Sequence, residues 1–355
     1  MNTRLGDLRV GLTFDDVLIV PRRSSVASRQ DVLIDTLLSR NVKLDLPVVA
    51  ASMDTVCEYE MAIAMARLGG LGIIHRFMPI ADQASQIVRV KEAGSHLSVG
   101  AAVGTHTDLI GRSEALVEAG VDALVLDIAH GHSDQAIRGV ETLKKRFKGV
   151  DVIAGNVATF AGASDLVEAG ADGVKVGVGP GGVCTTRIVA GVGVPQLSAI
   201  ADAVAAGVPV IADGGIRTSG DIAKALAAGA SSVMVGSLLA GTKESPGKVE
   251  QGSSGLQKRI RGMASFEAIR SRAIRSGEDP DEEYLEHRAA EGVTGAVPYR
   301  GEVSKLIWEL MAGLRSAMSY TDARNLTEFA EKAEFVMVTP LGIAENAPHA
   351  TNSTR

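Results

Sequence analysis

One cysteine in a glycine-rich segment is the residue best suited to chemistry. Cys184 ends the run GVGPGGVC (residues 177–184), and two hydroxyl residues, Thr185 and Thr186, follow it. The glycines and the proline prevent regular structure and let the backbone approach a ligand closely. A thiol on such a loop, just after an apolar strand, can act as a nucleophile. A lone cysteine is more often an inert buried side chain, but the glycine-rich frame and the two threonines favour the nucleophile here.

Eight short apolar runs, separated by helical patterns, supply the elements that would position this loop. Continuous Val/Ile/Leu runs of this kind indicate a buried parallel sheet, and eight of them predict an α/β fold of the closed (β/α)8, or TIM, barrel type. The active site of such a barrel lies at the C-terminal ends of its strands. The expected strands are 47–51, 71–75, 97–101, 123–127, 151–155, 173–176, 209–213 and 232–236. The residues at or after their ends include Ser52, Met53, Asp54, Asp127, Asn156, Cys184, Asp213, Gly236 and Ser237.

The composition excludes several classes of function. The chain has 355 residues and a formal net charge of −6, which offers no electrostatic attraction to nucleic acid or to an anionic membrane. No apolar run is long enough to span a bilayer, and the N-terminus lacks the apolar core of a signal peptide. The two cysteines, Cys57 and Cys184, are too few for a disulfide framework. We therefore expect a cytoplasmic protein with a working thiol.

A long insertion interrupts the barrel pattern before its last helix. About sixty residues separate the eighth strand from the helix expected at 303–318, far more than an ordinary barrel connection needs. The middle of the insertion, residues 275–283, is polar and acidic. A mobile lid is the functional interpretation, and a solvated disordered loop is the alternative. We expect one catalytic barrel over residues 1–355, with residues 242–300 forming the lid; the other expected helices are 58–68, 80–91, 107–119, 133–147, 159–169, 198–206 and 219–228.

The run of residues 177–186 resembles the catalytic loop of the IMP dehydrogenase / GMP reductase family. The resemblance extends over nearly the whole chain, through GLTFDDVL (11–18), ASMDTV (51–56), DGGIR (213–217), VGS (235–237), RGM (261–263) and EG (291–292). It implies that Cys184 adds to the purine C2 of a nucleotide and forms a covalent thioimidate. It also implies a homotetramer with a purine nucleotide as substrate.

The resemblance assigns roles to residues at matching positions. Thr186 and Glu291 match the family's acid relay, and Asp213 matches its contact to the ribose hydroxyls, although an Asp in this setting can simply cap the following turn. Backbone N–H groups of two glycine-containing turns after strands seven and eight would bind phosphate, the alternative being ordinary turns. These turns are Gly214-Gly215 and Gly236-Ser237, and the other substrate contacts implied are Ser52, Met53, Met263, Arg288 and Gly292.

A cofactor and a cation are implied in the same way. The nicotinamide side of the site would comprise Asp127, Ile128, Ala129 and Asn156. The glycine-rich loop resembles the family's monovalent-cation loop, with Gly179, Gly181 and Cys184 as candidate potassium ligands. Lys175 lies within the sixth strand, where a structural ion pair and a ligand role are equally compatible with the sequence. His130 and His132 suggest a metal pair, but no third ligand accompanies them, which disfavours zinc.

Two reactions are compatible with these residues. A dehydrogenase of this family uses a lid Arg-Tyr pair to hydrolyse the thioimidate, whereas Tyr284 here follows a glutamate, Glu283. Residues 287–292 and 74–77 resemble reductases, while residues 11–18, 261–263 and 313–316 resemble dehydrogenases. The regulatory modules that many dehydrogenases insert after the second helix have no place here.

We therefore expect NADPH-dependent reductive deamination of GMP to IMP and ammonia. The alternatives are a short IMP dehydrogenase that uses NAD, an enzyme acting on a modified purine nucleotide, and a nucleotide-binding protein without turnover. Gly182 and Ile260 motivate the modified nucleotide, because the resemblance implies a phosphate-binding serine at position 182 in most relatives and a phosphate-binding tyrosine at position 260 in dehydrogenases.

Overall fold

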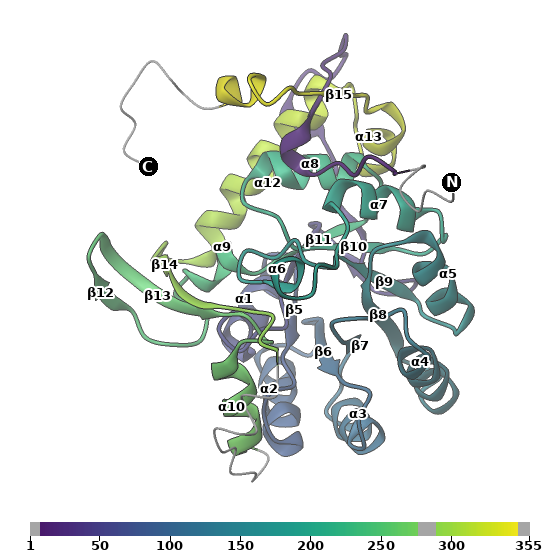
Figure 1. Ribbon diagram of the computed structural model, residues 1–355, viewed down its shortest axis with the longest axis vertical. Helices are drawn as coiled ribbons and strands as arrows, with labels where there is room; N and C mark the ends of the chain where they lie inside the picture. The colour runs from purple at the N-terminus through teal and green to yellow at the C-terminus, as the bar shows by residue number, and fades with distance from the viewer. Residues whose placement is uncertain (1–7, 276–288, 347–355) are drawn as a thin grey trace, which may run out of the picture.

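Eight parallel strands close into a barrel at the centre of the molecule (Figure 1). The computed structural model describes residues 8–275 and 289–346. Each neighbouring pair of barrel strands is parallel, and the circle closes between β11 and β4. The TIM-barrel prediction is confirmed. The strands are β4 (Val48–Ala50), β5 (Leu71–Ile74), β6 (Val99–Val103), β7 (Ala123–Asp127), β8 (Asp151–Val157), β9 (Gly173–Val176), β10 (Val210–Asp213) and β11 (Ser232–Val235).

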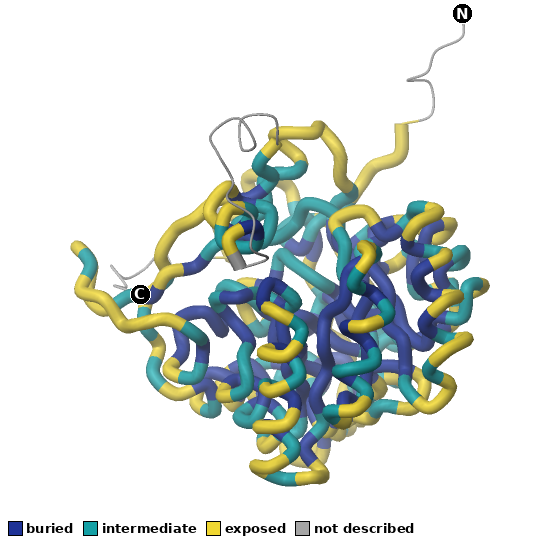
Figure 2. Tube along the Cα trace, turned by 90° about the horizontal axis from the view of Figure 1, so that it is seen from below, coloured by how far each residue is buried: buried dark blue, intermediate teal, exposed yellow. Residues whose placement is uncertain are grey.

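Helices surround the barrel, and local signals set their ends. The Ser133 and Thr159 hydroxyls accept from backbone N–H groups in the first turns of α4 and α5, and Thr218 and Asp221 form a capping box on α8. Buried residues concentrate in the strands and the inner helix faces (Figure 2). The surrounding helices are α1 (Tyr59–Arg67), α2 (Ile80–Ala93), α3 (Leu109–Glu118), α4 (Asp134–Arg146), α5 (Phe160–Glu168), α7 (Gln196–Val204), α8 (Ser219–Ala227) and α12 (Val303–Tyr320).

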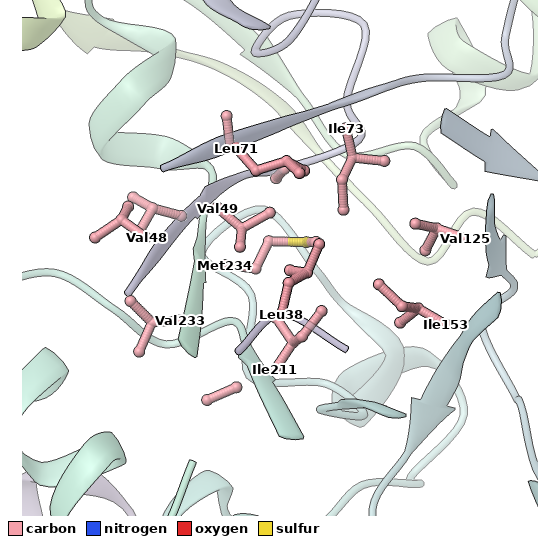
Figure 3. Close-up of a cluster of buried hydrophobic side chains, with 14 of the residues drawn as sticks. Leu38, Val48, Val49, Leu71, Ile73, Val125, Ile153, Ile211, Val233 and Met234 are labelled. Atoms are coloured by element: carbon pink, nitrogen blue, oxygen red, sulfur yellow. The ribbon is translucent and has the colours of Figure 1, made fainter. Parts of the chain in front are cut away.

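A short hairpin closes the N-terminal end of the barrel. Its strands are β2 (Thr36–Leu37) and β3 (Lys43–Leu44), and the fully buried Leu38 between them lies among barrel side chains such as Ile211 and Met234 (Figure 3). Ser39 donates to the Asp151 carboxylate at 2.6 Å, which ties the hairpin to the start of β8. This plug leaves the opposite, C-terminal end of the barrel for a ligand.

The two ends of the described chain meet beside the barrel. Strand β1 (Val17–Ile19) pairs antiparallel with β15 (Phe335–Met337). The remaining helical segments are η1 (Phe14–Asp16), η2 (Arg29–Asp31), α13 (Leu326–Lys332) and η3 (Gly342–Asn346). Among the described residues no helix is long and apolar enough to cross a membrane.

The expected lid region contains regular structure that the sequence did not indicate. An antiparallel sheet of β12 (Glu250–Gly252), β13 (Gly255–Arg261) and β14 (Thr294–Pro298) projects from one side of the barrel (Figure 1), and helix α10 (Phe266–Arg275) follows β13. Residues 276–283 of the acidic stretch lie outside the described residues. Two short helices, α6 (Thr186–Val189) and α9 (Ser237–Ala240), were also not expected, and α7 begins at Gln196 rather than at 198.

Candidate active site

A cavity of about 400 Å³ opens at the C-terminal ends of the barrel strands. Residues of β7, β8, β9, β10 and β11 and of the loops after β4, β5, β7 and β9 line it, together with residues of the insertion between β11 and α12. Most of the residues selected from the sequence therefore come together in one place. Those that line the cavity are Ser52, Met53, Asp127, Ile128, Ala129, Asn156, Gly179, Gly181, Cys184, Thr186, Asp213, Met263 and Glu291.

Cys184, Thr186 and Glu291 form a chain of hydrogen bonds. The Thr186 hydroxyl donates to Glu291 Oε2 at 2.7 Å, and Cys184 Sγ lies 3.2 Å from the same Thr186 oxygen. A hydroxyl has one proton, so while Thr186 donates to Glu291 its oxygen can accept only from the thiol S–H. The arrangement provides a route for a proton from the nucleophile to a carboxylate.

Backbone pairing explains why residues 105 positions apart meet. The segment around Gly292 pairs antiparallel with the end of the cysteine loop through a Cys184–Gly292 bridge. Thr185 N donates to the Glu291 carbonyl at 2.9 Å, and Val293 N donates to the Val183 carbonyl at 3.0 Å. These bonds fix the register that places the Glu291 carboxylate against Thr186.

A buried lysine joins two of the carboxylates expected to bind ligands. Lys175, only 2 % exposed, donates to Asp213 Oδ2 at 2.7 Å and lies 2.9 Å from Asp127 Oδ1. Ser52 donates to Asp127 Oδ2 at 2.7 Å. The Asn156 amide donates to Asp213 Oδ2 at 2.9 Å, and its oxygen accepts from Lys175. Of the two roles considered for Lys175, the structural ion pair is therefore present, and Lys175 also lines the cavity.

This cluster holds the Asp127 carboxylate and the Lys175 ammonium in their charged forms. Burial alone would raise the pKa of Asp127, but the Lys175 charge and the Ser52 hydrogen bond outweigh it, so that the pKa lies below its ordinary value. Burial alone would likewise lower the pKa of Lys175, but the charges of Asp127 and Asp213 raise it above its ordinary value. At neutral pH the cavity floor thus carries the Lys175 cation beside the Asp127 anion.

Five of the residues to which the resemblance assigned roles lie near the cavity without lining it. Gly214 and Gly215 both have positive φ and pack beside Pro180, where a Cβ on Gly214 would come within 2.9 Å of the proline ring. A Cβ on Gly182 would lie 3.1 Å from Ser237 Oγ, and one on Gly236 would lie 3.2 Å from Met53 Sδ. The turns expected to bind phosphate therefore surround the cysteine loop. The five are Gly214, Gly215, Gly236, Ser237 and Gly292, and Arg288 lies outside the described residues.

Several cavity residues were not selected from the sequence. Arg76 and Phe77 follow β5, and Arg272 projects from α10. Arg76 satisfies the same end-of-strand rule that identified the other candidates. Gln196, at the start of α7, donates to the carbonyls of Val176 and Asp213 and so ties the ends of β9 and β10 together.

The family model described as "IMP dehydrogenase / GMP reductase domain" matches residues 11–349. The chain belongs to this family. It is a purine nucleotide oxidoreductase that depends on a nicotinamide dinucleotide.

Individual members of the family resemble the chain along its whole length. It is 39% identical to an inosine-5'-monophosphate dehydrogenase of Aquifex aeolicus, in an alignment that covers 98% of this chain and 97% of the relative. It is 36% identical to a GMP reductase of Leishmania donovani, in an alignment that covers 97% of this chain and 98% of the relative. A crystal structure of a Trypanosoma brucei GMP reductase with guanosine 5'-monophosphate matches with a TM-score of 0.92 at 36% identity, covering 99% of this chain and 100% of that one. The Aquifex alignment spans 478 residues, so that relative contains sequence that these 355 residues lack.

The potassium ion expected from the sequence would need oxygen ligands in the cysteine loop. Backbone carbonyls can replace the hydration shell of potassium, and Gly179, Gly181 and Cys184 each carry one. The Gly181 carbonyl accepts the Cys184 N–H at 3.0 Å and keeps a second lone pair. The loop fits such an ion chemically, and potassium binding stays a prediction. His132 pairs with Asp165 at 2.8 Å, and the described residues contain no group of three or more metal-ligating side chains.

Proposed function

We propose that this protein catalyses the reductive deamination of GMP to IMP and ammonia with NADPH. The hydrogen-bond chain from Cys184 through Thr186 to Glu291 carries the proposal. A reductase must both activate a nucleophile and protonate a departing amine, and this chain is suited to both tasks. The sequence supplies no arginine at position 283 to activate the water that a dehydrogenase needs.

The proton balance follows the hydrogen bonds. The thiol proton moves to Thr186 as the Thr186 proton moves to Glu291, which leaves a Cys184 thiolate and a neutral carboxyl group. The thiolate adds to C2 of the purine, and the amino group leaves as ammonia after Glu291 returns the proton through Thr186. Cys184 is then bound to C2 as a thioimidate. When bound, NADPH would supply a hydride to C2, and the Cys184 thiolate released from C2 would regain a proton from solvent.

The rest of the cavity suits the two ligands. No described residue donates a hydrogen bond to Asp213 Oδ1, so this oxygen can accept from ribose hydroxyls. Asp127 belongs to the Lys175 cluster, and together with Ile128 and Ala129 it lines the same cavity and would face the nicotinamide. The nucleotide phosphate would bind at the turns of Gly214-Gly215 and Gly236-Ser237, which lie beside the cysteine loop.

The second candidate is an IMP dehydrogenase that uses NAD. Relatives named as such include one from Cryptosporidium parvum that is 43% identical over 96% of this chain and 95% of its own. A modified purine nucleotide is the third candidate. Ile260 is 2 % exposed and, like Gly182, offers no hydroxyl to a phosphate.

One absorbance assay of the reduced nicotinamide separates these candidates. Purified protein is mixed with GMP and NADPH in one cuvette and with IMP, NAD and potassium in another. Loss of absorbance with release of ammonia in the first alone supports the reductase, and a gain in the second alone refutes it. An unchanged absorbance in both mixtures favours another purine as substrate. Running the active mixture both with and without potassium tests the cation, and light scattering tests the expected homotetramer.

A further inference from the structure

Two arginines flank one aromatic ring at the end of the cavity near Asp127. The guanidinium carbon of Arg76 lies 5.3 Å from the centre of the Phe77 ring, and that of Arg272 lies 5.7 Å from it. Arg76 comes from the loop after β5, whereas Arg272 comes from α10 in the insertion. All three residues line the same cavity as Cys184 and Glu291.

Carboxylates do not neutralise either arginine directly. Within residues 8–275 and 289–346, neither guanidinium has an Asp or Glu oxygen within 4.0 Å. Arg76 makes one long hydrogen bond of 3.4 Å, to the Asp127 carbonyl, and packs on Gly104. Burial lowers the pKa of Arg76, and nearby Arg272 lowers it further against the attraction of Asp127. Both side chains nevertheless stay protonated, because arginine keeps its charge in proteins.

A pair of like charges in a half-buried position is unfavourable unless an anion joins it. Guanidinium groups match the geometry of phosphoryl oxygens, and they stack on aromatic rings while doing so. The Phe77 ring, 8 % exposed, holds both groups at the cavity wall and leaves their N–H donors for a ligand.

We propose that Arg76 and Arg272 bind a phosphate group of the nicotinamide dinucleotide, with Phe77 holding the two side chains in place. This inference rests on the proposed function in so far as that function requires a dinucleotide. The proposed phosphate site of the nucleotide substrate lies elsewhere, at the turns after β10 and β11. Arg76 instead contacts Asp127 on β7, the side of the cavity assigned to nicotinamide. The phosphate is either the pyrophosphate, common to NADH and NADPH, or the 2'-phosphate of NADPH alone.

Binding without turnover tests the proposal. NADPH and NADH are titrated separately into the protein in the presence of IMP, a mixture that neither candidate reaction consumes, and nicotinamide fluorescence gives the Kd. Arg272→Gln should raise the Kd roughly tenfold to a hundredfold, as expected for loss of hydrogen bonds between charged groups. Arg272→Lys should recover part of the loss because it keeps the charge. Arg270→Gln is the matched control, since Arg270 lies exposed on the same helix and does not line the cavity.

The two dinucleotides identify which phosphate is bound. A loss of affinity confined to NADPH assigns the arginines to the 2'-phosphate. An equal loss of affinity for NADPH and NADH assigns them to the pyrophosphate. An unchanged Kd for Arg272→Gln overturns the proposal, and so does an equal loss of affinity in Arg270→Gln. Failure of the unaltered protein to bind either dinucleotide also overturns it. The proposed function fails separately, in the turnover assay with GMP, and its failure leaves this binding result intact.

Discussion

Removal of the Lys175 charge tests the central electrostatic argument. Lys175→Met keeps an unbranched side chain of similar length but leaves Asp127 and Asp213 as two close carboxylates without their cation. Both carboxylates lie within hydrogen-bond distance of the ammonium, at 2.9 and 2.7 Å, and the lysine is 2 % exposed. Deleting one partner of a buried ion pair costs about 3–5 kcal/mol, because a buried charge is left uncompensated.

Urea denaturation at neutral pH measures this loss of unfolding free energy. Lys243→Met is the control, because Lys243 and Glu302 form a 3.6 Å pair in which both side chains are 65 % exposed. Such surface pairs contribute about 0–1 kcal/mol. A Lys175→Met variant no less stable than the control would refute the account of the cluster.

The pH dependence of the unfolding free energy tests the same argument. The lowered pKa of Asp127 stabilises the native protein above the ordinary pKa of an aspartate, and this contribution is lost as the pH falls through the lower folded value. Without Lys175, burial raises the pKa of Asp127, so the folded variant binds a proton more readily than the unfolded chain. The difference in unfolding free energy between the unaltered protein and Lys175→Met should therefore become smaller from neutral pH to about pH 5. A difference in unfolding free energy that stays constant over this pH range would contradict the reasoning.

Three further variants test the site. Cys184→Ala should abolish turnover while calorimetry still detects nucleotide binding, and residual turnover would rule out the covalent mechanism. Glu291→Gln should slow ammonia release by roughly 10²–10⁴-fold, the usual contribution of a general acid or base; an unchanged rate would remove it from the relay. Gly182→Ser would place a hydroxyl beside Ser237, whose Oγ lies 3.1 Å from the point that the new Cβ would occupy. If the nucleotide phosphate binds there, GMP should bind roughly tenfold more tightly by calorimetry, and no change would place the phosphate elsewhere.

The barrel could be predicted from the sequence because its strands are buried on both sides. Continuous apolar runs such as those of β7 and β8 mark such strands whatever surrounds them. The sheet of β12, β13 and β14 escaped prediction because its strands are rich in polar residues or glycine and contain no continuous apolar run. Helix α6 escaped because Thr186–Val189 contains β-branched residues, which favour strands when considered locally.

The site could be predicted only in part, for a related reason. The end-of-strand rule brings Asp127 and Asp213 to one end of the barrel, but it does not place Lys175 between them. That contact depends on the inward direction of a strand residue and on the barrel register, which pairs β9 with both β8 and β10. Arg272 belongs to an insertion whose position no barrel rule specifies. Pairwise geometry across the fold, rather than local pattern, creates these contacts.

The proton route from Cys184 to Glu291 is divided between two parts of the chain that can diversify separately. The thiol belongs to a loop fixed by the barrel, whereas the carboxylate belongs to the insertion before α12, held in register by the Cys184–Gly292 bridge. Substitutions at Glu291 can thus alter how the proposed covalent adduct is resolved while the nucleophile on the barrel loop stays unchanged. Within one family, this arrangement allows a change confined to the insertion to replace one reaction outcome by another.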